Sequence, residues 1–144
     1  WGWRRLAEFV CEKTGVVEEN DKREWQSNGG HVVSEETAFQ IAKQLKALIK
    51  DGTVSKVIKE VEEETEKAEK NNKFVQECHD MLAKKVERET GKSNLAPAEY
   101  PEKDHSTWSW IQSKYSYGSS YPFCMENVEE FIKFCEDSRG FKIC

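Results

Sequence analysis

Residues 34–52, SEETAFQIAKQLKALIKDG, combine a helix start, an amphipathic period and a helix stop in one segment. The Ser34 hydroxyl can accept from backbone N–H groups of a first turn, and Glu35 and Glu36 place negative charge at the positive end of the helix dipole. Gly52 can adopt the left-handed conformation that ends many helices. Apolar residues recur at spacings of three and four along one face, at Ala38, Ile41, Ala42, Leu45, Leu48 and Ile49. The sequence therefore predicts a central helix whose apolar face other segments must cover.

Length and composition set the class of protein. The chain has 144 residues, of which 37% are hydrophobic and 34% charged, and this length can bury a core, so we expect a single domain over residues 1–144. The net charge is -5, and basic and acidic residues are mixed without a basic stripe, which argues against nucleic acid as a partner. No apolar run approaches the roughly 20 residues that span a bilayer, and residues 1–5 lead into an amphipathic helix. We expect a soluble, cytoplasmic protein with no membrane partner.

The N-terminal part of the chain predicts a short helix followed by a hairpin. Apolar residues near the start lie at helical spacing, at Trp3, Leu6, Ala7, Val10 and Cys11. The pair Asn28-Gly29 tolerates positive φ at both central positions of a primed turn, so it predicts a β-hairpin with strands over residues 24–26 and 31–33. The second strand would run directly into the helix that begins at Ser34.

The C-terminal part predicts one more helix and a terminal strand. Val128, Phe131, Ile132 and Cys135 share a helical face, and residues 141–144 alternate as a strand that can pair with residues 31–33. The predicted fold is therefore α+β and mainly α. Its amphipathic helices pack with a small antiparallel sheet, which is formed by the hairpin at Asn28-Gly29 and the C-terminal strand.

Residues 53–90 have the pattern of one long helix. Apolar positions at its two ends are in phase, and Glu and Lys lie four residues apart between them, an arrangement that stabilises an exposed helix. At 1.5 Å per residue it would be about 55 Å long, whereas a compact chain of this size has a radius of gyration of about 15 Å. It therefore either bends at Asn71-Asn72 or projects to meet a second copy. In the second alternative the protein is a homodimer, because the copy covers apolar positions such as Val75 and Leu82.

Residues 93–123 lose the helical spacing and are rich in aromatic residues. We predict an irregular region there, with short strands where Trp108-Ser109-Trp110 and Tyr115-Ser116-Tyr117 alternate. Tyr, Trp, Ser and Gly together are typical of recognition surfaces, because the rings provide contact area at low conformational cost. The alternative is that these rings cover the helices as part of the core. The candidate binding surface consists of Trp108, Trp110, Tyr115, Tyr117 and Tyr121.

The cysteine and histidine residues allow two interpretations of their role. Five cysteines without a C-x-x-C pair are typical of reduced thiols packed as small apolar residues. The alternative is a metal site formed by Cys124, Cys135, Cys144 and His79, since zinc takes four such ligands. The sequence contains no nucleophile elbow, no H-E-x-x-H, no P-loop and no G-x-G-x-x-G. We therefore expect neither catalytic residues nor a cofactor.

Several stretches at the two ends of the chain form a recognisable set: WGWRRL at residues 1–6, FVC at 9–11, NGG at 28–30, VSEE at 33–36, ENV at 126–128, FC at 134–135 and GFKIC at 140–144. Together they resemble a group of small uncharacterised bacterial proteins, a domain of unknown function. The resemblance covers about half of the chain and implies a bacterial cytoplasmic setting, without an activity. Members of the group often carry closely paired cysteines in the middle of the chain. This sequence has a charged helical segment there, which argues against a metal site.

Two classes of function follow from these patterns. The first is a non-enzymatic protein-interaction module, which the acidic net charge and the aromatic region suit, and which could be of the immunity or antitoxin type. Its partner would be another protein or a second copy of the chain. The second is a small enzyme or zinc-binding protein that uses Cys and His side chains.

Overall fold

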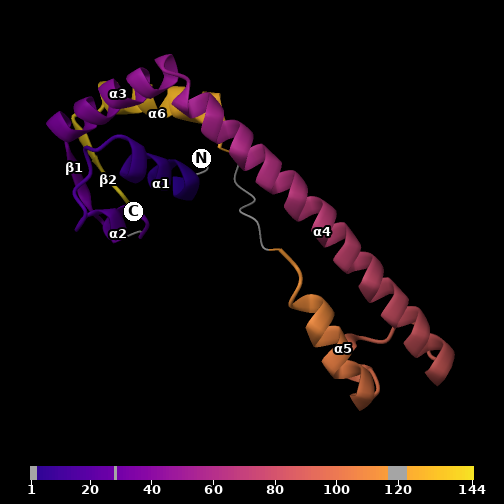
Figure 1. Ribbon diagram of the computed structural model, residues 1–144. Helices are drawn as coiled ribbons and strands as arrows, with labels where there is room; N and C mark the ends of the chain where they lie inside the picture. The colour runs from indigo at the N-terminus through magenta and orange to yellow at the C-terminus, as the bar shows by residue number, and fades with distance from the viewer. Residues whose placement is uncertain (1–2, 28, 117–122) are drawn as a thin grey trace. The chain divides into compact units, whose positions relative to one another are not determined.

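The structure is a computed structural model that describes residues 3–27, 29–116 and 123–144 (Figure 1). The described residues form six α-helices, one short 3-10 helix and two strands. Their bounds are α1 Trp3–Lys13, α2 Lys22–Trp25, β1 Val32–Ser34, α3 Glu35–Lys50, α4 Thr53–Thr90, η1 Pro97–Glu99, α5 Glu102–Gln112, α6 Met125–Asp137 and β2 Gly140–Lys142. This mainly helical architecture with a small antiparallel sheet confirms the predicted α+β fold class.

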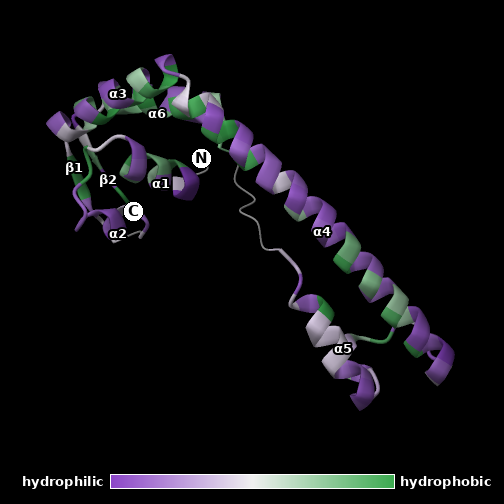
Figure 2. Ribbon diagram, viewed as in Figure 1, coloured by the Kyte–Doolittle hydropathy of each residue, from purple (hydrophilic) through white to green (hydrophobic). Residues whose placement is uncertain are grey.

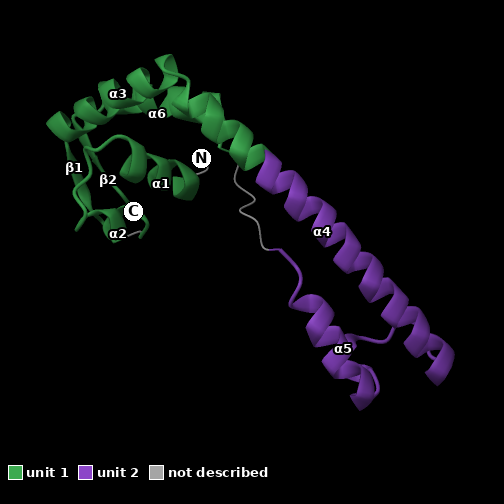
Figure 3. Cartoon of the chain, viewed as in Figure 1, with its two compact units in different colours: residues 1–62, 119–144 green, residues 63–118 purple. Residues whose placement is uncertain are grey.

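The chain divides into two compact units (Figure 3). Unit 1 comprises residues 1–62 and 119–144, and unit 2 comprises residues 63–118. The long helix α4 begins in unit 1 and ends in unit 2. Each unit has a buried apolar cluster of its own.

Helix α3 is the central packing element of unit 1, as the sequence predicts. The Ser34 hydroxyl accepts a hydrogen bond from the Thr37 N–H at 3.1 Å, which caps the helix. The predicted apolar face packs on α6 and on both strands, and hydrophobic segments of α3 and α6 are visible in Figure 2. Ile41 and Leu45 are fully buried, whereas Leu48 is half-buried at the edge of the cluster.

The two strands pair antiparallel, with Val33 opposite Phe141. Pairing of residues 31–33 with the C-terminal strand is therefore confirmed. The predicted partner strand at residues 24–26 is wrong, because Trp25 ends helix α2 and Gln26 follows in a turn. The physical reason is the burial of Trp25, whose ring is stacked 5.7 Å from that of Trp3. Asn28 of the expected hairpin turn lies outside the described residues.

Helix α4 is uninterrupted from Thr53 to Thr90, so the predicted bend at Asn71-Asn72 is wrong. Most of its apolar positions are covered within the two units. Val54 is buried in the cluster of unit 1, and Val75, Leu82 and Val86 are buried in that of unit 2. The argument that these residues need a second copy for cover therefore fails, and self-association stays a prediction without that support.

In the region predicted to be irregular, residues 93–123, the described part contains the helices η1 and α5. The predicted strand at Trp108-Ser109-Trp110 is wrong, because these residues are helical. The alternation of Trp and Ser misled the prediction, whereas the spacing that decides the structure is helical. Asp104, Trp108 and Ile111 recur at four and three residues and form the face of α5 that packs on unit 2's buried cluster.

Candidate functional site

Helices α4 and α5 form an antiparallel pair in unit 2. The Lys85 ammonium donates to Asp104 Oδ1 at 2.7 Å, and Asn71 Nδ2 donates to the Lys114 carbonyl at 2.7 Å. From the first contact to the second, the residue number on α4 falls from 85 to 71, whereas the number of the partner residue on and just after α5 rises from 104 to 114. The two helices therefore run in opposite directions with a fixed register.

The ion pair at one end of this helical pair is anchored by a buried carboxylate. Asp104 is 1% exposed, and the hydrogen bond that it accepts raises the pKa of Lys85 above its ordinary value. Glu89 extends the cluster, since it lies 3.9 Å from the Lys85 ammonium and 2.6 Å from that of Lys103. These contacts fix the start of α5 against the last turns of α4.

The middle of the pair is held by His79 of α4. Its ring lies 5.5 Å from that of Trp108, and its Nε2 is 3.1 Å from Gln112 Oε1. Nδ1 is buried and has no hydrogen-bond partner among the described residues. Both ring partners of His79 come from α5, so the histidine serves to join the two helices.

The far end of the pair is held by the two asparagines that the sequence suggested as a hinge. Asn72 Nδ2 donates to the Ser116 carbonyl at 2.8 Å, and Asn72 Oδ1 accepts from the Ser116 N–H at 2.7 Å. Asn71 binds the carbonyl of Lys114. The segment that follows α5 is therefore attached directly to α4.

Three large apolar side chains of unit 2 are more than half exposed, although the unit has its own buried cluster. The exposed fractions are 65% for Phe74, 71% for Met81 and 62% for Trp110. Lys114 Nζ lies 5.2 Å from the centroid of the Trp110 ring, a cation–π contact that restricts the ring. We call these three residues the exposed apolar face.

Helix geometry places the three residues on the same side of the pair. At about 100° per residue, Phe74 and Met81 lie about 100–120° from the buried line through Val75, and Trp110 lies about 100° from buried Ile111 in the same sense of rotation. Antiparallel helices turn in opposite senses when they are viewed from one end. Side chains that are rotated by the same angle from the buried line of each helix therefore point to the same side of the pair.

The ion pairs support this placement independently. Lys85 follows Met81 by four residues on α4, and Lys103 precedes Trp110 by seven residues on α5, so each lysine shares a helix face with an apolar residue. Glu89 contacts both lysines. The Met81 face of α4 and the Trp110 face of α5 are therefore adjacent.

Charge is distributed unequally around the helical pair. The same 100° rule places acidic Glu69, Asp80 and Glu87 on the opposite side. The side of the exposed apolar face carries the acidic residues Glu63, Glu77 and Glu89, together with Glu66, which pairs with Lys70 at 3.7 Å. Its basic residues are more numerous, at Lys67, Lys70, Lys85, Arg88, Lys103 and Lys114. An acidic protein thus presents a locally basic, aromatic surface.

Only part of the candidate binding surface predicted from the sequence lies on this face. Trp110 is exposed there, but Trp108 is half-buried in the cluster of unit 2, which is the alternative core role. Tyr115 is 40% exposed just beyond α5. Tyr117 and Tyr121 lie outside the described residues.

Sequence reasoning did not include Phe74 and Met81 in the candidate binding surface. A signal was present in their spacing. Phe74, Cys78 and Met81 are separated by four and three residues and form a second apolar line beside that of Val75 and Leu82. One neighbouring helix cannot cover a stripe of that width, so part of it stays exposed.

The alternative metal site receives no support from the described residues, in which no three His, Cys, Asp or Glu side chains are grouped so that they could hold an ion. His79 belongs to unit 2 and packs on Trp108, whereas Cys124, Cys135 and Cys144 belong to unit 1. All five cysteines are present as free thiols. Burial raises the pKa of Cys11 to about 11 and that of Cys135 to about 12, so these two are poor nucleophiles near neutral pH.

Comparison of the chain with protein-family models, with curated proteins and with solved structures finds no match. The bacterial family resemblance of the two chain ends therefore stays a prediction. Among the helices that the structure describes, none is both long and apolar enough to cross a membrane.

Proposed function

We propose that this protein acts by binding another protein and that the exposed apolar face of unit 2 is the contact surface. The observation that supports the proposal is the exposure of Phe74, Met81 and Trp110 on one side of a helical pair that already buries a separate apolar cluster. Exposed apolar residues that gather on one side mark interaction sites more often than isolated ones do.

The residue types and their setting suit an interface. Trp and Met are enriched at the centres of protein interfaces, and Trp is a frequent source of binding energy. The Lys114 contact restricts the Trp110 ring before a partner arrives, which lowers the entropy lost on binding. The ion pair of Lys85 with the buried Asp104 and the asparagine contacts hold the two helices that carry the surface.

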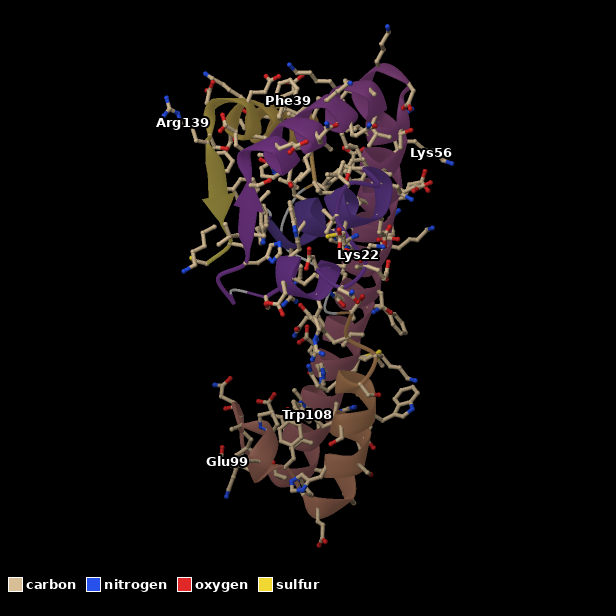
Figure 4. All side chains as sticks on the ribbon, turned by 90° about the vertical axis from the view of Figure 1, so that its left-hand side faces the viewer. Lys22, Phe39, Lys56, Glu99, Trp108 and Arg139 are labelled. Atoms are coloured by element: carbon tan, nitrogen blue, oxygen red, sulfur yellow. The ribbon has the colours of Figure 1, made fainter. Side chains whose placement is uncertain are left out.

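The proposal is tested by comparative affinity purification from cells that produce the protein. Tagged wild-type protein is compared with the double variant Phe74→Ala and Trp110→Ala, and with Phe39→Ala as a matched control. Phe39 is 58% exposed on α3 in unit 1, outside the proposed surface (Figure 4). Circular dichroism establishes that each variant keeps its helical content.

We expect at least one protein to be recovered with the wild type and with Phe39→Ala but lost with the double variant. Reconstitution from purified components must then show a direct complex of the two chains. Equal recovery of every protein with all three baits would contradict the proposal.

A further inference from the structure

We infer that the occupant of this surface is an acidic amphipathic helix, which lies along α4 and α5 and completes a three-helix bundle. The inference rests on the proposed function and specifies the chemistry of the partner. Four steps support it: the spacing of the apolar residues, the place of Trp110, the local charge, and the poor fit of a second copy.

The apolar residues of the surface follow the spacing of a helix seam. Phe74, Cys78 and Met81 lie at intervals of four and three residues, as do residues that face one neighbour in a bundle. Phe74 and Met81 are exposed, whereas Cys78 is half-buried at the edge of the unit 2 cluster. Val75, Leu82 and Val86 form another line that α5 already covers. In unit 2, helix α4 thus has two apolar lines, of which α5 covers one. The spacing of the other line suits contact with a second helix.

Trp110 extends the seam onto α5. The register of the pair places it level with residues 75–79 of α4, because Lys85 meets Asp104 and Asn71 meets Lys114. An exposed ring at that level, between Phe74 and Met81, extends the apolar surface of α4 onto α5. A helix whose apolar stripe lies on this surface contacts both helices.

The charge beside the seam favours an acidic occupant. Lys67, Lys70, Arg88 and Lys114 lie on this side of the helical pair, and Lys70 forms an exposed ion pair with Glu66 at 3.7 Å. An amphipathic helix with Glu or Asp beside its apolar stripe would place opposite charges against them. This complementarity speeds association and disfavours basic partners.

A second copy of the chain fits the seam poorly. In a two-fold antiparallel pairing of α4 centred between Phe74 and Met81, the sum of facing residue numbers is constant, so Lys70 of one copy faces Lys85 of the other and Lys67 faces Arg88. In a parallel pairing every residue faces its own counterpart, so each lysine meets a lysine. Both arrangements bring like charges together, which is unfavourable.

Designed peptides added to the full chain test the inference. The first peptide is an amphipathic helix of about 18 residues with Leu at intervals of three and four and Glu beside the stripe, long enough to span the seam at 1.5 Å per residue. The second has the same stripe with Lys in place of Glu. The third has the composition of the first in an order without helical periodicity. Affinity is measured by isothermal titration calorimetry at low and at physiological salt.

We expect saturable binding of the Glu peptide, weakening of that binding by salt, and at least about tenfold weaker binding of the other two peptides. Met81→Lys and the double variant Phe74→Ala and Trp110→Ala should each lose about tenfold or more in affinity. Glu69→Lys and Glu87→Lys, on the opposite side of α4, serve as matched charge controls and should change the affinity little.

Three results would overturn the inference. One is equal binding, or no binding, of all three peptides. Another is binding of the chain to anionic phospholipid vesicles with no binding of the Glu peptide. The third is a dimer of twice 16.7 kDa in light scattering that Met81→Lys converts to a monomer. Failure of this inference can be distinguished from failure of the proposed function. If the Glu peptide does not bind but the double variant still loses a natural partner, the proposed function stands and the acidic helix is excluded as the occupant.

Discussion

Asn72 and Ser116 form a two-way hydrogen-bonded pair, in which the asparagine amide donates to the Ser116 carbonyl at 2.8 Å and accepts from its N–H at 2.7 Å. The side chain thus satisfies both backbone groups of one residue, as a neighbouring strand would. Backbone groups that leave water need such partners. The residue that sequence propensity marks as a weak point in α4 therefore has a structural role, since it fixes the end of the segment that carries Trp110.

Asn72→Ala should loosen this attachment without melting α4. Two hydrogen bonds are lost, each with a net value of about 0.5–1.5 kcal/mol, while Ala is the better helix former. We expect the Ser116 amide to exchange with solvent markedly faster in hydrogen-exchange NMR, with helical circular dichroism unchanged. Gln76→Ala on the same helix is the matched control, because Gln76 donates a hydrogen bond within α4, to Asp80. Unchanged protection of Ser116 in Asn72→Ala would show that the pair is not formed in solution.

Leu45→Ala should destabilise unit 1 by about 2–5 kcal/mol, because Leu45 is fully buried where α3 packs on α6 and the lost side chain leaves a cavity. Phe39→Ala, which truncates an exposed residue of the same helix, should cost less than about 1 kcal/mol. The loss in free energy of unfolding of each variant is measured by urea unfolding, followed by circular dichroism. Similar losses for the two variants would mean that the buried face of α3 is assigned wrongly.

Gly140→Ala should destabilise the sheet more than Gly52→Ala destabilises the turn before α4. Both glycines have positive φ, at 89° and 84°, so both substitutions carry backbone strain. At Gly140 a new Cβ would also lie 2.6 Å from the Val33 carbonyl oxygen, whereas at Gly52 it would meet nothing within 4 Å. The difference between the two variants in urea unfolding isolates the clash, and equal losses would contradict close approach of β1 and β2.

The parts of the fold that could be predicted from sequence are those in which local and tertiary preferences agree. In α3 the Ser34 cap, the apolar period and the glycine stop all favour the same helix, and it forms as expected. At Trp25 the local and the tertiary preferences conflict. The turn signal at Asn28-Gly29 favours a hairpin, but stacking on Trp3 and burial of the large ring favour α2, and these tertiary contacts decide the structure.

The candidate site could be predicted from the sequence only in part. The sequence marked Trp110 through its aromatic neighbours, yet whether a ring faces solvent depends on the register of α5 against α4. That register is set by contacts between residues far apart in the chain, such as Lys85 with Asp104 and Asn72 with Ser116. Local periodicity contains no information about such contacts, so Trp108 and Trp110 could not be separated before the helical pair was known.

The buried thiols should make the protein less stable as pH rises from about 9. Burial raises the pKa of Cys11 to about 11 and that of Cys135 to about 12, from an ordinary value of 9.0. Above pH 9 the unfolded chain releases these protons while the folded chain keeps them. The unfolded state then binds fewer protons, and the free energy of unfolding falls with rising pH.

Urea unfolding between pH 8 and 10 measures this effect below the range in which raised lysine pKa values, such as those of Lys22 and Lys85, add to it. The double variant Cys11→Ala and Cys135→Ala should show a shallower fall of stability with pH than the wild type, whatever its absolute stability. Cys144→Ala should keep the wild-type slope, because Cys144 is exposed and its thiol meets water in both states. Identical slopes for all three proteins would show that the buried thiols ionise as readily in the folded chain as in the unfolded one.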